Sequence, residues 1–161
     1  MSSGQQPDRG HAGWAQALNA AGSFAVSLTP LRADRNATVE SIRTALLGAG
    51  QRQAAMIVLG QLDSDYTEAV LPELLAAALS HRDTQRVRRL LGQLPHREAA
   101  MSVPPAVWRQ LAETPDEDAY RRMAELLDHL GLADALRTLI SRAGSSPDPA
   151  VREVTEQFHA P

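Results

Sequence analysis

The chain has five histidines, the residue type best suited to general acid–base chemistry and metal binding near neutral pH. No two of them have the i, i+4 spacing of a zinc-binding helix, and none shares a short motif with two carboxylates. The sequence therefore predicts no metal site. The five histidines are His11, His81, His96, His129 and His159.

Several kinds of catalytic residue are absent from the sequence. It contains no cysteine, and all 16 basic residues are arginine. This composition excludes a thiol nucleophile, a cysteine-ligated metal, a Schiff-base lysine and a P-loop lysine. The carboxylate pairs Glu117-Asp118 and Asp63-Ser64-Asp65 lie where helices are expected to start, so helix capping explains them better than catalysis. We expect no enzymatic activity and no cofactor.

Length and composition fit one ordinary globular domain. The chain has 161 residues, of which 43% are hydrophobic, and a net charge of −3. An acidic balance argues against a nucleic-acid-coating protein, which is usually strongly basic. The apolar runs are too short to span a membrane and no signal peptide is visible, so a cytoplasmic location and no membrane partner are expected. The preference for arginine and alanine suggests a GC-rich bacterial genome.

Apolar residues recur at helical spacing from Thr38 onward. In one segment they fall at Val87, Leu90, Leu91 and Leu94, which is the i, i+3, i+4, i+7 pattern of one buried stripe. Two further segments also carry apolar stripes at helical spacing, and the fold class is therefore predicted to be all-α. Their stripes are Tyr120, Met123, Leu127 and Leu130, and Leu136, Leu139, Ile140 and Ala143.

Helix breaks are also regular. Gly48-Ala49-Gly50 suits a helix end, Asp83-Thr84 could cap a helix start, and Pro104-Pro105 predicts a boundary. Pro72 predicts a helix start near Leu71, or a kink there. With the repetition of Val58-Leu59-Gly60-Gln61-Leu62 as Leu90-Leu91-Gly92-Gln93-Leu94, these breaks suggest about four helical hairpins. The expected hairpins cover residues 38–62, 66–94, 104–130 and 132–159.

A short motif at the start of the second helices resembles HEAT repeats. Asp148-Pro149-Ala150-Val151-Arg152 is similar to the Asp-x-x-Val-Arg pattern of that family, and Asp83-Thr84-Gln85-Arg86-Val87-Arg88 has one residue more. The third unit keeps only Asp118 and Arg121, and the first has lost the motif. The resemblance implies a short right-handed α-solenoid in which Asp83, Arg88, Asp148 and Arg152 hold the stack together. A tetratricopeptide-like array or a plain helical bundle is the alternative.

The first 37 residues differ from the rest. Residues 1–13 are rich in Ser, Gly, Gln and Pro and are expected to form a disordered tail. Residues 14–37 are expected to cap the helical repeat domain, which would occupy 38–161. A strand over Ser23–Thr29, and an arm exchanged with another subunit, are alternatives for this segment. Dimerisation through Trp14–Leu28 or through the C-terminal helix also stays open.

Positive charge is concentrated in the middle of the chain. Residues 81–101 carry five arginines against two acids, whereas the segments on both sides are acidic. In HEAT arrays the second helices line a concave surface, so the resemblance implies that Arg86, Arg89, Arg121 and Arg122 face a groove. Arginine there could pair with a carboxylate or a phosphate. The alternative is an ordinary solvated face.

These observations predict a non-catalytic adaptor that binds an acidic segment or helix of a protein partner. Arg86, Arg89, Arg121 and Arg122 would supply the charge, and Trp108 is either a buried core residue or a recognition anchor. One alternative is a small-molecule-binding protein or biosynthetic enzyme with its pocket in the helical groove. Another is nucleic-acid binding through the same arginines, which the net charge disfavours.

Overall fold

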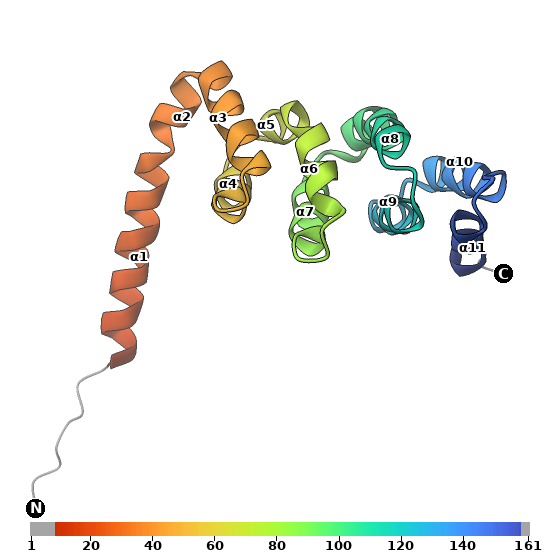
Figure 1. Cartoon of the computed structure of the whole chain (residues 1–161). Coiled ribbons are helices and arrows are strands. Elements are labelled where there is room, and N and C mark those ends of the chain that lie inside the picture. The colour runs from red at the N-terminus through yellow and green to blue at the C-terminus, as the bar shows by residue number, and fades with distance from the viewer. Residues whose placement is uncertain (1–8, 159–161) are drawn as a thin grey trace, which may run out of the picture. The chain divides into compact units, whose positions relative to one another are not determined.

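A computed structural model describes residues 9–158 of the chain (Figure 1). The elements in this range are helices and their connections, and no strand occurs among the described residues, so the all-α prediction is confirmed. The helices are α1 (Arg9–Ser27), α2 (Thr29–Ala33), α3 (Arg35–Leu47), α4 (Arg52–Leu59), α5 (Ser64–Ala69), α6 (Leu71–Ala78), α7 (Thr84–Leu91), α8 (His96–Glu113), α9 (Glu117–His129), α10 (Ala133–Gly144) and α11 (Pro149–Phe158).

The N-terminal segment is helical where it is described. Of the expected tail, residues 1–8 lie outside the described residues, and residues 9–13 belong to α1. The strand considered for Ser23–Thr29 is not formed, because α1 runs to Ser27 and α2 begins at Thr29. The alternation of Phe24, Val26 and Leu28 is short, and the described residues contain no strand with which such a segment could pair.

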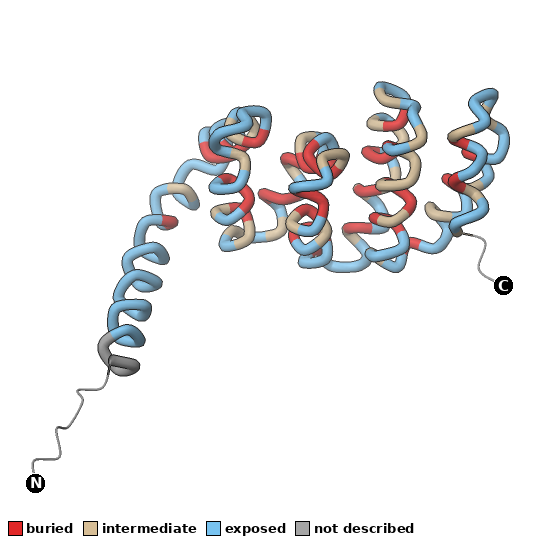
Figure 2. The backbone as a smooth tube through the Cα atoms, turned by 60° about the horizontal axis from the view of Figure 1, so that its bottom comes forward, coloured by how far each residue is buried: buried red, intermediate tan, exposed pale blue. Residues whose placement is uncertain are grey.

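Contacts divide the chain into one unit of residues 1–38 and another of residues 39–161. In the first unit, residues 13–27 of α1 are exposed, as the pale blue tube in Figure 2 shows, whereas Leu28 after it is buried. The hydroxyl of Thr38 donates a hydrogen bond of 2.8 Å to the carbonyl of Leu31. The backbone amide of Ala37 donates to Asp34 Oδ1 at 3.0 Å, so Asp34 caps the first turn of α3.

In the unit of residues 39–161, several helices that follow one another in the chain pack against each other. These contacts join α6 with α7, α8 with α9, α9 with α10, and α10 with α11. Contacts also join α6 to α8, and they connect α4, α7, α9 and α11 in that order. Figure 2 marks the buried residues of these helices in red. Most of the buried hydrophobic residues form one cluster.

The predicted apolar stripes account for much of this cluster. Val87, Leu90, Leu91 and Leu94 are all buried, as expected. Met123, Leu127, Leu139 and Ala143 are buried too, while Tyr120, Leu130, Leu136 and Ile140 are partly buried. Helical periodicity therefore identified the faces that pack.

The boundary expected at Pro104-Pro105 is not present. Both prolines lie inside α8, which runs from His96 to Glu113. They leave the carbonyls of Ala100 and Met101 without their helical donors, but both residues are exposed and water can reach them. The buried stripe continues across the prolines, which explains why the helix continues as well. Its members are Ala99, Val103, Ala106, Val107 and Leu111.

Pro72 behaves as expected, because it lies in the first turn of α6 directly after α5 ends.

Helix capping is only partly as expected. Asp148 Oδ1 accepts a hydrogen bond of 2.9 Å from the amide of Ala150, but neither Asp63 nor Asp83 makes a side-chain cap. Arg152 donates to the carbonyls of Ser146 and Pro147, in the loop before its own helix. It therefore secures that loop, and within residues 9–158 its side chain forms no hydrogen bond or ion pair with another helix.

Three ion pairs join separate helices in this unit. Arg43 Nε lies 2.7 Å from Glu73 Oε1, Arg52 Nη1 lies 3.3 Å from Asp83 Oδ2, and Arg88 pairs with Glu125. The charge of Glu73 raises the pKa of Arg43, so this guanidinium keeps its charge at any ordinary pH. Asp83 and Arg88 thus connect neighbouring helices, which is the role that the resemblance implied for them.

Candidate functional site

A polar pocket of about 340 Å³ lies between α7 and α9. Thr84 and Arg88, at positions i and i+4, lie on one face of helix α7 and form one side of the pocket, with Gln85 beside them. Helix α9 forms the other side of the pocket with residues spaced one turn apart, and His81 lies in the turn that precedes α7. The lining residues are His81, Thr84, Gln85, Arg88, Asp118, Arg121, Arg122 and Glu125.

Two of the three arginines in this pocket are already paired with acids. Arg88 forms an ion pair with Glu125 across the two helices. Arg121 pairs with Glu117 and, at 3.3 Å, with Asp118, both on its own helix. These contacts hold the two guanidinium groups in place and offset their charge.

Within residues 9–158, no acid lies within ion-pair distance of Arg122. Its Nη1 atom lies 3.5 Å from the hydroxyl of Thr84, which is a long contact, and its Nε atom is buried without a hydrogen-bond partner. The Nε atoms of Arg88 and Arg121 are also buried and unpartnered. A partly buried guanidinium that lacks a counter-ion is costly to keep, and an anion from outside the chain would relieve that cost.

The predicted arginines are therefore only partly brought together. Arg121 and Arg122 share the α7/α9 pocket, whereas Arg86 and Arg89 do not line it. Arg86 donates a hydrogen bond of 3.4 Å to the carbonyl of Gln53 on α4, and Arg89 is exposed. Neither of them has an acid within ion-pair distance among the described residues.

Some pocket residues were missed from the sequence. Thr84 and Gln85 were not considered as site residues, and Arg88 was expected only to hold the helices together. The i, i+4 relation of Thr84 to Arg88 was visible in the sequence. Its connection with Arg122 was not, because Thr84 and Arg122 are 38 residues apart and meet only through the packing of α7 on α9.

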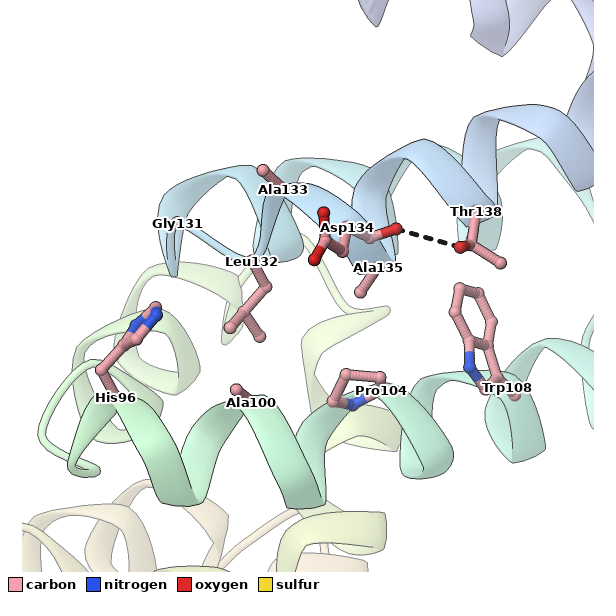
Figure 3. Close-up of a pocket in the computed structure, with 10 residues that line it drawn as sticks. All are labelled: His96, Ala100, Pro104, Trp108, Gly131, Leu132, Ala133, Asp134, Ala135 and Thr138. Atoms are coloured by element: carbon pink, nitrogen blue, oxygen red, sulfur yellow. Dashed lines mark hydrogen bonds between the residues drawn. The ribbon is translucent and has the colours of Figure 1, made fainter.

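Trp108 lies in a second pocket, an open cleft of about 430 Å³ between α8 and α10 (Figure 3). The ring is partly buried and packs against the hydrophobic cluster. The guanidinium of Arg142 lies over it at 4.6 Å from the ring centre, which is a cation–π contact. Figure 3 shows the Trp108 side chain pointing from α8 toward Thr138 on α10. Trp108 is thus both a packing residue and part of a cleft wall.

Within residues 9–158, no group of three or more His, Asp or Glu side chains is arranged to hold a metal ion. No helix in that range is both long and apolar enough to cross a bilayer. Comparisons with known protein families, with characterised proteins and with solved structures find no match to this chain.

Proposed function

We propose that residues 38–161 form a short right-handed α-solenoid of HEAT-like hairpins. Support comes from the sequence separation of the contacts that join the helices. Arg43 meets Glu73 at a separation of 30 residues, Arg52 meets Asp83 at 31, and Arg88 meets Glu125 at 37. Repeated contacts at nearly one period are typical of stacked repeats, in which each unit touches only its neighbours.

We further propose that this array is a protein-interaction module that binds an acidic segment of a partner. The observation that carries this proposal is a group of arginines without acidic partners on two adjacent helices. Arg86 and Arg89 lie on α7, and Arg122 lies on α9. Arginine is suited to such recognition because its planar guanidinium pairs with two carboxylate oxygens at once.

An exposed apolar side chain lies close to Arg86. Ile57 on α4 is 51% exposed and lies one turn from Gln53, whose carbonyl accepts the hydrogen bond from Arg86. A partner segment that contains both acids and an apolar residue could therefore bury Ile57 while its acids pair with arginine. Interfaces of this kind owe most of their affinity to a few such contacts.

A protein partner is favoured over nucleic acid by the acids on the same surface. Asp118 and Glu125 line the α7/α9 pocket together with Arg122, and they would repel a run of phosphates. Nucleic-acid binding draws its affinity from many uncompensated cations. Three arginines on α7 and α9 are few for that purpose.

The test is binding of a labelled peptide of alternating glutamate and leucine, followed by fluorescence anisotropy. We expect the double variant Arg86→Glu/Arg89→Glu to lose binding by about tenfold or more, because each reversal replaces attraction by repulsion. The matched control is Arg97→Glu/Arg109→Glu, which reverses two exposed arginines on α8. Equal loss in both variants would show a general charge effect and refute the assignment. Stronger binding of a single-stranded oligonucleotide than of the peptide would support the nucleic-acid alternative.

A second candidate function rests on the cleft between α8 and α10. Its volume of about 430 Å³ and its Trp108 wall suit a small organic ligand. A thermal-shift screen against metabolites tests this candidate, since a ligand at a hundred times its dissociation constant adds about 2.7 kcal/mol of stability. The ligand effect should disappear in Trp108→Ala and persist in Arg86→Glu/Arg89→Glu.

A further inference from the structure

Three arginines line the α7/α9 pocket, and one of them has hydrogen-bond donors left for a ligand. Arg88 pairs with Glu125, and Arg121 pairs with both Glu117 and Asp118, so these three arginines and three acids balance in charge. Among the described residues, no acid lies within ion-pair distance of Arg122, and its Nε atom is buried without a hydrogen-bond partner. The hydrogen-bonding capacity of Arg122 is therefore what the pocket offers to a ligand.

Arg122 can still form new hydrogen bonds. Its Nη1 atom makes only the 3.5 Å contact with Thr84, and its Nη2 atom has no hydrogen-bond partner and is not among the buried unpartnered atoms. Both Nη atoms can therefore donate into the pocket. Two parallel donors at this spacing match the two oxygens of one carboxylate.

The acids around Arg122 select against ligands of higher charge. Asp118 and Glu125 both line the pocket, so a phosphate dianion would gain one guanidinium and meet two carboxylates. A carboxylate carries a single charge, so it meets less repulsion from these acids and still accepts from both Nη atoms of Arg122. The cavity of about 340 Å³ also admits the carbon atoms that carry the carboxylate.

We propose that the α7/α9 pocket is a carboxylate-binding site in which Arg122 pairs with the side chain of one aspartate or glutamate. This inference rests on the proposed function, because that residue would belong to the acidic segment of the partner. Arg122 supplies both hydrogen bonds of the pair. The Gln85 side-chain amide lies at the same pocket and can orient the ligand, whereas the Thr84 hydroxyl already donates to the carbonyls of Ala78 and Ser80.

The first experiment uses the whole chain labelled with ¹⁵N and follows the arginine Nε–Hε signals by NMR. The signal of Arg122 is assigned with the Arg122→Lys variant. The probes are N-acetyl-glutamate α-amide, which carries one side-chain carboxylate, and its neutral analogue N-acetyl-glutamine amide. We expect the acid to shift the Arg122 signal in a saturable way and the neutral analogue to leave it in place. Equal shifts with both probes, or a shift spread evenly over all arginines, would overturn the proposal.

Two further probes separate the sources of the anion. Inorganic phosphate should bind more weakly than N-acetyl-glutamate α-amide, because the pocket acids repel a dianion, and the reverse order would overturn the proposal. Acetyl-leucine carries only a chain-terminal carboxylate. Tighter binding of that probe would assign the pocket to a chain terminus and would contradict a side-chain ligand.

The last step distinguishes this inference from the proposed function. Arg122→Gln should weaken binding of the glutamate–leucine peptide by about tenfold, as expected when a hydrogen bond to a charged group is lost. Arg122→Lys keeps the charge but loses the paired donors, so it should restore the affinity only in part. If peptide binding is lost in Arg86→Glu/Arg89→Glu but unchanged in Arg122→Gln, the interaction module is supported and the carboxylate pocket is refuted. If no acidic peptide binds while N-acetyl-glutamate α-amide shifts Arg122, the pocket stands and the adaptor function fails.

Discussion

Asp83 Oδ2 lies 3.3 Å from Nη1 of Arg52, so the acid that precedes α7 contacts the start of α4 and does not cap its own helix. Arg52 also donates from Nε to the carbonyl of Leu46 at 2.7 Å, which joins the end of α3 to the same group. Asp83 is 7% exposed and Arg52 27% exposed in their side chains. One ion pair thus connects three helices.

Replacement of Asp83 should destabilise the fold. In Asp83→Ala the partly buried Arg52 loses its counter-ion, and we expect the free energy of unfolding to fall by about 1–3 kcal/mol. The measurement is urea denaturation followed by circular dichroism. Asp134→Ala is the control, because the Asp134–Arg137 pair is almost fully exposed and such pairs contribute roughly 0–1 kcal/mol. Equal effects of the two variants would show that the Asp83–Arg52 pair is not structural.

A core substitution should have a larger effect than the same substitution at the surface. Leu127 on α9 is fully buried, so Leu127→Ala should lower the free energy of unfolding by about 2–5 kcal/mol through lost burial and a residual cavity. Leu47 at the end of α3 is 67% exposed, and Leu47→Ala should change it by less than about 0.5 kcal/mol. Denaturant midpoints of both variants check this difference. A small effect at Leu127 would contradict the packing of α9 in the core.

Because α8 is continuous, we expect Pro105 in its interior to lower the free energy of unfolding. Pro105 is exposed and lacks the amide that would bond to the carbonyl of Met101. Pro105→Ala restores that hydrogen bond and should raise the free energy of unfolding by about 1–2 kcal/mol, after allowance for the looser unfolded chain. Pro72→Ala in the first turn of α6 is the matched control, and there little change is expected. A loss of stability in Pro105→Ala would indicate that the helix breaks at this point.

The two tryptophans should differ in their access to solvent. Trp14 on α1 is 66% exposed, whereas Trp108 is partly buried beneath Arg142. The Trp108→Phe variant, which retains only Trp14, should therefore be quenched more strongly by acrylamide and emit at longer wavelength than Trp14→Phe. Equal quenching in the two variants would show that Trp14 is covered, for example by a second copy of the chain.

Much of the fold could be predicted from the sequence because helix periodicity is local. The stripe of Val87, Leu90, Leu91 and Leu94 identified a buried face without any knowledge of its partner, and Pro72 identified a helix start. The same local reasoning failed at Pro104-Pro105. Proline disfavours a helix interior by a few kcal/mol, but burial of Val103, Ala106 and Val107 on the same helix outweighs that cost.

The candidate site was predictable only in part. The resemblance to HEAT repeats pointed to Arg121 and Arg122, but also to Arg86 and Arg89, which do not line the pocket. Whether an arginine is free depends on which acids lie near it in space. Glu125 compensates Arg88 from 37 residues away, and no pattern in the sequence reveals that pairing.

The sequence by itself determined the helical character of the chain, the faces that would be buried and the surplus of arginine around α7. Each of these depends on residues within a few turns of one another. Only the tertiary structure decided that Asp83 meets Arg52 and that Arg122 is left without an acid, because both results depend on how α4, α7 and α9 pack. Charges interact through distance in space, and that distance is fixed by packing between helices that lie 30 or more residues apart in the chain.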